Sequence, residues 1–190
     1  MNFTRLADFL DRLPGRGIPG VDCAVTLNGE QVFRHGAGEV SEDAVYNLYS
    51  ASKPITCTAA LQLYEQGHFL LNTQVREFLP EYGDVTVRHR LPDGSEEIRP
   101  ATRPVLMRDL FAMSAGLTYD TNSPAFKELN ARTNGAPTTR EVAAAMAQSP
   151  LMFEPGEHWN YSMCHDVLAA VIEVISGQRF SDYLQENIFD

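Results

Sequence analysis

Residues 50–67 read SASKPITCTAALQLYEQG, and this stretch decides the fold that we expect. Its apolar residues recur at the helical period, and Gly67 can take the left-handed conformation that commonly ends a helix. Pro54 fits a helix that starts near Ser50, because a backbone N–H in the first turn has no intrahelical acceptor to lose. The stretch therefore predicts a helix that carries Ser50 and Lys53 on one face of its first turn.

Ser50 and Lys53 have the spacing of a nucleophile and its base. A serine hydroxyl needs a base at neutral pH, and a lysine can serve only if its pKa is lowered. The positive end of the helix and the apolar neighbours predict such a lowered pKa for Lys53. The chain contains only two lysines, Lys53 and Lys127, against thirteen arginines. An exposed lysine without a catalytic role is the alternative that the motif by itself leaves open.

The surrounding pattern predicts further helices and two β-hairpins. Asn28-Gly29 is a strong turn signal for the first hairpin, whereas the second is polar and expected at the surface. Thr138 and Glu141 have the spacing of a capping box. We expect helices over residues 4–13, 105–112, 139–148 and 162–176, a last short helix capped by Ser181, and hairpins over residues 21–35 and 84–101.

Composition and charge exclude several classes of protein. With 44% hydrophobic and 21% charged residues, the chain is neither disordered nor fibrous. A net charge of -10 without a basic stripe speaks against nucleic acid and anionic membranes as partners. No apolar window reaches the roughly 18 residues of a membrane span, and no signal peptide is visible, so we expect a cytoplasmic protein. Three widely spaced cysteines predict free thiols.

Several segments occur in a characteristic order: YNLYSASKP (46–54), LLNTQV (70–75), LFAMSAGL (110–117), FEPG (153–156), NYS (160–162) and Ser176-Gly177. Together they resemble the serine β-lactamase-like superfamily, in the branch that holds class C β-lactamases, penicillin-binding DD-peptidases and related esterases. The resemblance covers essentially the whole chain. We expect an α/β (α+β) fold in which the first helix and the Ser50 helix pack on an antiparallel sheet, beside a mainly helical lobe.

The resemblance identifies Tyr161 as the tyrosine that moves a proton between serine, lysine and leaving group. A phenol beside an ammonium and a helix N-terminus would have its phenolate favoured, although Tyr161 could also simply pack at the start of the helix. Met163 stands where the family often has asparagine, which weakens the β-lactam and peptide interpretations in favour of an esterase. His165 and Asp166 could replace that amide as polar contacts to substrate, or could only cap the helix.

Trp159 and possible metal ligands complete the set of candidate residues. Trp159 could line an acyl pocket, but a tryptophan in the core is the interpretation that we favour. His158, Cys164 and His165, together with Asp166, match no usual zinc spacing, so we expect neither a metal nor a cofactor.

The predicted domain is a β-lactamase-like domain over residues 1–190. Residues 1–104 would form an α/β part with the nucleophile helix and the surface hairpin, and residues 105–190 a mainly helical part. The family's third motif, Lys-Thr-Gly or His-x-Gly on a late strand, is absent, and the predicted strands are too few to complete the sheet. We interpret the chain as an N-terminal portion without its C-terminal strands, which a second chain or fragment could complete.

These residues predict a serine hydrolase that acts on a small-molecule ester or amide. Ser50 would attack the carbonyl, Lys53 would take its proton, Tyr161 would pass a proton to the leaving group, and water would hydrolyse the acyl-enzyme. An esterase is favoured, with a β-lactamase or DD-peptidase as the alternative. A non-catalytic binding module with a degenerate site is the alternative from another class, and it predicts no acylation of Ser50.

Overall fold

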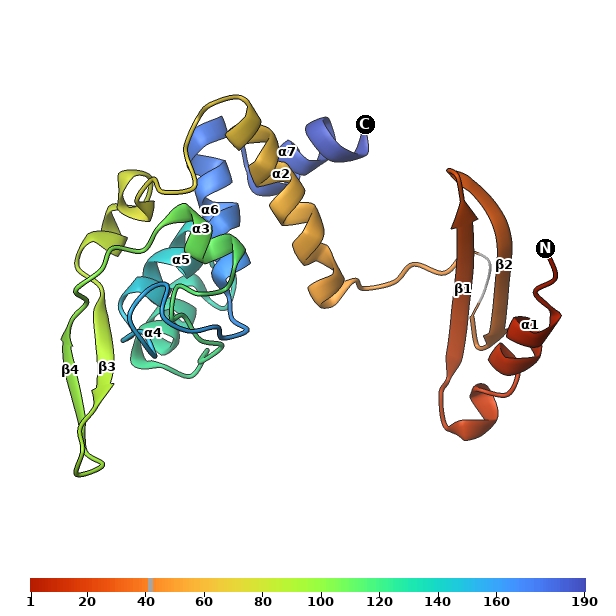
Figure 1. The fold of residues 1–190 in the computed structure, drawn as a ribbon, viewed down its shortest axis with the longest axis horizontal. Coiled ribbons are helices and arrows are strands. Elements are labelled where there is room, and N and C mark those ends of the chain that lie inside the picture. Colours follow the sequence, from red (N-terminus) through yellow and green to blue (C-terminus); the bar gives the residue numbers. More distant parts are fainter. Residues whose placement is uncertain (41–42) are drawn as a thin grey trace. The chain divides into compact units, whose positions relative to one another are not determined.

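The computed structural model describes residues 1–40 and 43–190. The chain divides into two compact units, Met1–Leu48 and Tyr49–Asp190, and each unit is described by itself (Figure 1). The first unit contains α1 (Thr4–Leu10), a 3₁₀ turn (Pro14–Arg16) and the strands β1 (Gly20–Leu27) and β2 (Glu30–Gly38).

The second unit is mainly helical. Its hairpin consists of β3 (Thr86–Arg90) and β4 (Glu96–Pro100), and the strands of both hairpins are antiparallel. The expected mixture of helices and antiparallel strands is therefore confirmed, while the division into residues 1–104 and 105–190 stays a prediction. The α-helices are α2 (Lys53–Glu65), α3 (Met107–Phe111), α4 (Pro124–Thr133), α5 (Thr139–Ala147), α6 (Cys164–Ser176) and α7 (Phe180–Leu184), with 3₁₀ turns at Tyr49–Ser52, Val75–Glu77 and Pro80–Gly83 and a π-helical turn at Gln185–Phe189.

The hairpin of the first unit has the predicted turn. Asn28 and Gly29 both adopt positive φ, at 51° and 85°, as a tight hairpin turn with a right-handed strand twist requires. α1 packs on β2 through the rings of Phe3 and Phe33, whose centroids lie 4.8 Å apart. We also expected the Ser50 helix to pack on this sheet. The helix and the sheet belong to different units, so this packing stays a prediction.

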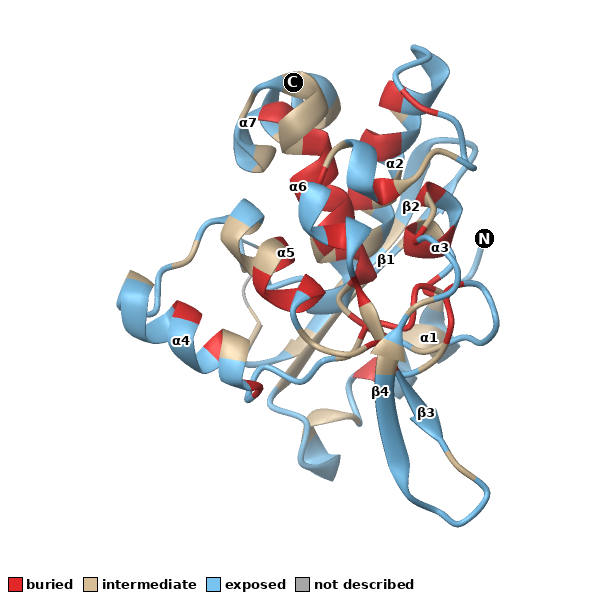
Figure 2. Cartoon of the chain, turned by 90° about the vertical axis from the view of Figure 1, so that its left-hand side faces the viewer, coloured by how far each residue is buried: buried red, intermediate tan, exposed pale blue. Residues whose placement is uncertain are grey.

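The core of the second unit forms around α6. Helices α2, α3 and α5 all pack against α6, which Figure 2 shows in red along most of its length. Apolar residues at the helical period place Val167, Leu168, Val171 and Ile172 in the interior, each at most 1% exposed. Gly177 ends α6 with a φ of 70°, as the sequence predicts. No helix of the described residues is both long enough and apolar enough to cross a bilayer.

The second hairpin lies at the surface, as expected, except where it joins the core. Most residues of β3 and β4 are exposed, but Val87 is buried and forms an isolated parallel bridge with Leu151. The backbone N–H of Arg88 donates to the Leu151 carbonyl over 2.8 Å. The segment that follows α5 is thereby bonded to the base of the hairpin.

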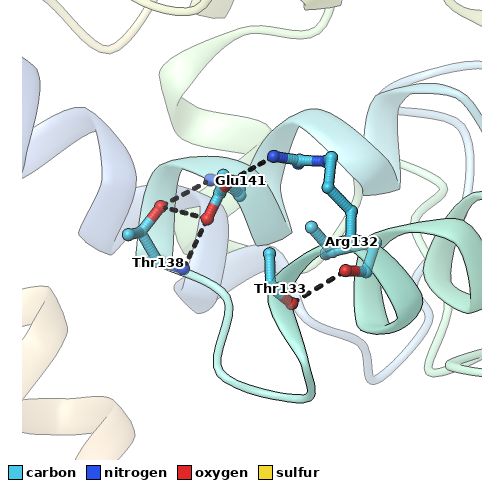
Figure 3. Close-up of polar contacts among 5 residues, drawn as sticks. Arg132, Thr133, Thr138 and Glu141 are labelled. Carbon is cyan, nitrogen blue, oxygen red and sulfur yellow. Dashed lines mark hydrogen bonds and ion pairs between the residues drawn. The ribbon is translucent and has the colours of Figure 1, made fainter.

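Helices α4 and α5 are bonded to each other at the surface (Figure 3). The predicted capping box is present, because Thr138 and Glu141 exchange side-chain to backbone hydrogen bonds at the start of α5. Arg132 on α4 forms an ion pair with the same Glu141 over 2.7 Å. The sequence analysis missed α4, although Ser123 caps it and Pro124 occupies its first turn.

The predicted end of the first helix and the predicted start of the last helix are wrong. α1 ends at Leu10 rather than Leu13, because Pro14 starts a separate 3₁₀ turn. Ser181 does not cap the last helix: α7 begins at Phe180, whose backbone N–H donates to the Glu173 carboxylate of α6 over 2.9 Å. A carboxylate distant in sequence thus replaces the local cap that we expected.

We predict that even an alanine side chain at position 116 lowers the free energy of unfolding. The φ of Gly116 is 83°, and an added Cβ would lie 2.5 Å from the Phe153 carbonyl oxygen. Gly67 has the same φ of 83° but no atom within 4 Å of such a Cβ. Gly67→Ala should cost about 1 kcal/mol for the left-handed backbone, and Gly116→Ala about 2 kcal/mol more for the clash. Equal shifts of the urea midpoints of the two variants would contradict this prediction.

Candidate active site

The Ser-x-x-Lys stretch straddles two helical segments. Ser50 lies in the 3₁₀ turn Tyr49–Ser52, and Lys53 is the first residue of α2, so the α-helix itself starts three residues later than expected. Pro54 falls in the first turn, where its missing N–H costs nothing. The Ser52 hydroxyl donates to the Tyr49 carbonyl over 2.6 Å, whereas the Ser50 side chain is exposed at the surface.

Tyr49 holds an unusual backbone conformation next to the proposed nucleophile. Its φ is 46°, in the left-handed region, which costs a residue other than glycine about 1–2 kcal/mol. The bond from Ser52 stabilises this turn. Strained backbone of this kind is enriched at functional sites, so the conformation of Tyr49 is consistent with a chemical role for Ser50.

Backbone bonds position Tyr161, which lies just before α6. The backbone N–H of Asn160 donates to the Met113 carbonyl over 3.0 Å, and its side-chain amide donates to the Leu117 carbonyl over 2.9 Å. These bonds tie the segment before α6 to the loop that follows α3. As a result, the ring of Tyr119 stacks on that of Tyr161 with centroids 5.7 Å apart.

Lys53 lies against both phenol rings. Its Nζ is 5.2 Å from the ring centroid of Tyr161 and 5.7 Å from that of Tyr119, within the usual range of a cation–π interaction. The Ser50 side chain also interacts with the Tyr161 phenol. The structure therefore brings together Ser50, Lys53 and Tyr161, from two regions more than a hundred residues apart in the sequence.

The pKa of Tyr161 is lowered, as the sequence analysis expected. The largest cause is the interaction with the Ser50 side chain, and the Lys53 charge contributes in the same direction. Tyr119 also lowers the pKa, while partial burial opposes these effects. The cluster therefore favours the phenolate form of Tyr161.

The pKa of Lys53 is raised, which corrects the expectation that its surroundings would lower it. Desolvation does lower the pKa, but the hydrogen bond and charge of Tyr119 outweigh it, with further contributions from Tyr161 and Asp166. Sequence reasoning considered only the helix terminus and the apolar neighbours, and not the two phenols and the carboxylate that the fold brings to the ammonium. The raised pKa favours the charged form of Lys53 at neutral pH.

His165 lies in the interior between α2 and α6. It is 9% exposed, its Nε2 is 3.5 Å from the Cys57 thiol, and the same nitrogen is 3.4 Å from the Phe111 carbonyl oxygen. Burial, together with the Lys53 charge, lowers its pKa, so the ring is neutral at pH 7. The observed partners of His165 are thus the Cys57 thiol and the Phe111 carbonyl, and its role toward a substrate stays a prediction.

Met163 and Trp159 have different surroundings. Met163 is half-buried and packs against the apolar core, at the residue that precedes α6. Trp159 is 68% exposed, so the favoured interpretation as a core tryptophan is wrong. Its ring centroid lies 6.4 Å from that of Tyr161. A role for Trp159 in binding an acyl group stays open.

Tyr119 is the residue of this cluster that sequence analysis missed. It follows the LFAMSAGL segment by two positions and lies in an irregular loop, where no period or motif marks it. Only the backbone bonds described above bring its ring to Lys53. Within residues 1–40 and 43–190, no three His, Cys, Asp or Glu side chains gather as metal ligands.

Known proteins resemble this chain along nearly its whole length. The Beta-lactamase family model matches residues 6–190. Esterase EstB from Burkholderia gladioli is 31% identical over 90% of this chain and 45% of its own length, and lovastatin esterase from Penicillium rubens is 28% identical over 90% and 46%. The chain thus spans about half the length of the curated relatives that it matches.

Solved structures share the fold. A D-stereospecific amidohydrolase from a Streptomyces species superimposes with a TM-score of 0.78 at 22% identity, covering 100% of this chain and 54% of the other. EstCE1, described as a hydrolase with promiscuous acyltransferase activity, gives a TM-score of 0.74 at 23% identity, covering 98% and 50%. With the family match and the sequence relatives, these findings show that the chain belongs to the Beta-lactamase family, among relatives that are esterases, acyltransferases and amidohydrolases.

Proposed function

We propose that this chain carries the nucleophile and the proton-transfer groups of a serine esterase that works through an acyl-enzyme. The observation that carries the proposal is the position of Lys53 against the ring of Tyr161, 5.2 Å from its centroid, with the Ser50 side chain interacting with the same phenol. A nucleophile, a proton acceptor and a cation thus meet at one exposed place. A lysine with only a structural role at the start of a helix would not require a serine and a phenol beside it.

The directions of the pKa shifts assign the proton-transfer roles. Tyr161, with its lowered pKa, is the acceptor for the Ser50 proton, and Lys53, with its raised pKa, stays charged and stabilises the phenolate. This assignment replaces the direct transfer to Lys53 that the sequence analysis predicted. The Ser50 oxygen bonds to the carbonyl carbon, its proton goes to Tyr161, and Tyr161 returns a proton to the departing alcohol.

The second half of the reaction uses the same groups. Tyr161 takes a proton from water, the hydroxide attacks the acyl carbon, and Ser50 recovers its proton as the acid leaves. The positive end of α2 stabilises the tetrahedral oxyanion of each step. No step requires a cofactor.

Esters are the substrate class that the relatives support. Burkholderia EstB and the Penicillium enzyme are both named as esterases, and a further relative, CalJ from Penicillium decumbens, is named as an acyltransferase. Hydrolysis and acyl transfer differ only in the acceptor, which is water or an alcohol. Met163, which packs into the core, supplies no side-chain amide for a β-lactam or peptide, so these substrates rank below esters.

Ser50→Ala should abolish covalent labelling of the chain. A fluorophosphonate should add one phosphonyl group to the native chain by displacing fluoride, and intact-mass spectrometry measures this adduct. Ser52→Ala is the matched control and should keep the adduct, because the Ser52 hydroxyl is engaged with the Tyr49 carbonyl. Penicillin, tested in parallel, should give no adduct. Adducts with both reagents would restore the β-lactam alternative, and no adduct with either would contradict the acyl-enzyme proposal.

The rate of labelling at Ser50 should rise with pH as Tyr161 ionises, with a midpoint below the ordinary phenol value of 10.0. Lys53→Met removes the cation that favours the phenolate, so the ascending limb should move to higher pH and the rate at neutral pH should fall by about 10²-fold or more. Lys127→Met on α4 is the matched control and should leave the profile unchanged. A limb that stays in place in Lys53→Met would contradict the roles assigned to the two residues.

Trp159→Ala should reduce hydrolysis of long-chain esters more than that of acetates. An exposed indole beside Tyr161 offers apolar area to an acyl chain but little to an acetyl group, so kcat/KM for p-nitrophenyl octanoate should fall roughly tenfold. Phe189→Ala, which also removes an exposed ring of the second unit, is the control. Equal loss for both esters would argue against an acyl-binding role of Trp159.

A further inference from the structure

We propose that Tyr119 is a positioning residue of this site, whose ring and hydroxyl hold the Lys53 ammonium against Tyr161 and so present the Tyr161 phenol to Ser50. The inference rests on the proposed function, because it assigns a role in the same proton transfer. It goes beyond that function by adding a second phenol that touches neither the nucleophile nor the reacting carbonyl.

The loop that carries Tyr119 is fixed by backbone bonds rather than by burial of the ring. Gly116 accepts a hydrogen bond from the Met152 N–H over 2.8 Å, and Leu117 accepts one from the Asn160 side chain over 2.9 Å. Around the tyrosine itself, the Asp120 N–H donates to the Thr118 hydroxyl over 3.0 Å. The loop is therefore anchored just before Tyr119, whose ring stacks on that of Tyr161.

Two rings restrain the ammonium better than one. The lysine stem has four rotatable bonds, so a single cation–π contact leaves Nζ free to swing away from the ring. The Tyr119 and Tyr161 rings are nearly parallel, inclined by 23°, with Nζ close to both. Tyr119 thus limits the positions of Lys53 to those beside the Tyr161 phenol.

The exposure of the two rings is inconsistent with a role in packing alone. Tyr119 is 45% exposed and Tyr161 is 41% exposed, and neither belongs to the apolar core of the unit. A stacked pair at the surface gains little from the hydrophobic effect compared with buried rings such as Phe69. The stacking of the two rings at the surface is better explained by the Lys53 ammonium, which lies against both of them.

The charged and titratable groups that act on Lys53 come from three segments. Tyr119 comes from the loop after α3, Tyr161 from the segment before α6, and Asp166 from α6 itself. His165, also on α6, is neutral at pH 7 and lies on the Cys57 side of α2. Tyr119 both hydrogen-bonds Lys53, which raises the pKa of the lysine, and lowers the pKa of Tyr161. Removal of its hydroxyl should weaken both effects.

The experiment is a spectroscopic titration of the phenols, which requires no turnover. The absorbance of phenolate near 295 nm is followed with pH in the folded native chain and in Tyr161→Phe, Tyr119→Phe and Tyr119→Phe/Tyr161→Phe. The component that Tyr161→Phe removes belongs to Tyr161. Tyr119→Phe keeps the stacked ring and removes only the hydroxyl, so the ionisation constant of Tyr161 should fall roughly two- to tenfold, the worth of one hydrogen bond.

Tyr64→Phe is the matched control, because Tyr64 is also partly exposed and pairs with a ring, Phe69, but lies near the opposite end of α2. It should remove one phenol and leave the Tyr161 component in place. The rate of fluorophosphonate labelling should fall at neutral pH in Tyr119→Phe and recover at high pH, since the phenolate can still form there. A merely structural residue would change the rate without moving its pH dependence.

The outcomes separate the two proposals. A Tyr161 component that stays in place in Tyr119→Phe overturns the role of Tyr119, whether or not Ser50 is labelled. Absence of labelling in the native chain overturns the proposed function, and the titration then still reports whether Tyr119 acts on Tyr161. A shifted component together with a shifted labelling profile supports both.

Discussion

The packing of α2 against α6 is the interaction on which the candidate site depends. Lys53 begins α2 and Tyr161 lies just before α6, so the two residues meet only because both helices start at the same end of their shared interface. The contact between Cys57 and His165 also joins the two helices, about one helical turn further along. Both helices contribute fully buried residues to the core, such as Ala59 and Ala60 on α2 and Ala170 on α6.

The loop after α3 provides the second support of the site. Gly116 lets the backbone approach the Phe153 carbonyl closely, and Asn160 bonds back to the loop through both its backbone and its side chain. These contacts link two segments that carry recognisable family sequence, LFAMSAGL and NYS. Together these contacts set the distance between the Tyr119 loop and the start of α6. They thereby determine which groups surround the Lys53 ammonium.

The electrostatics of the cluster follow from this geometry. An ammonium beside two phenols and within reach of a carboxylate is favoured in its charged form, and the same charge favours the phenolate of the closer partner. The attraction between Lys53 and Tyr161 contributes to both pKa shifts, beside the larger effects of Ser50 on Tyr161 and of Tyr119 on Lys53. The proposed nucleophile, Ser50, is exposed and follows the left-handed Tyr49, and the proposed proton acceptor, Tyr161, has a lowered pKa.

The sequence by itself determined the elements with strong local signals: the Asn28-Gly29 hairpin, the capping box at Thr138 and the left-handed glycines that follow α2 and α6. Helical periodicity and the order of the family segments also predicted that Ser50, Lys53 and Tyr161 belong to one site. The turn, the cap and the glycines depend on neighbours a few residues away, which a linear pattern contains, whereas the prediction of a joint site depended on the resemblance to a known family.

Only the tertiary structure decided the rest. The pKa of Lys53, the exposure of Trp159, the cap of α7 by Glu173 and the presence of Tyr119 at the ammonium all depend on groups that are remote in sequence. A charge responds to whatever the fold places within a few ångströms of it, and burial depends on which surfaces the chain covers. Neither quantity has a signature in the local sequence, because both are properties of the packed chain.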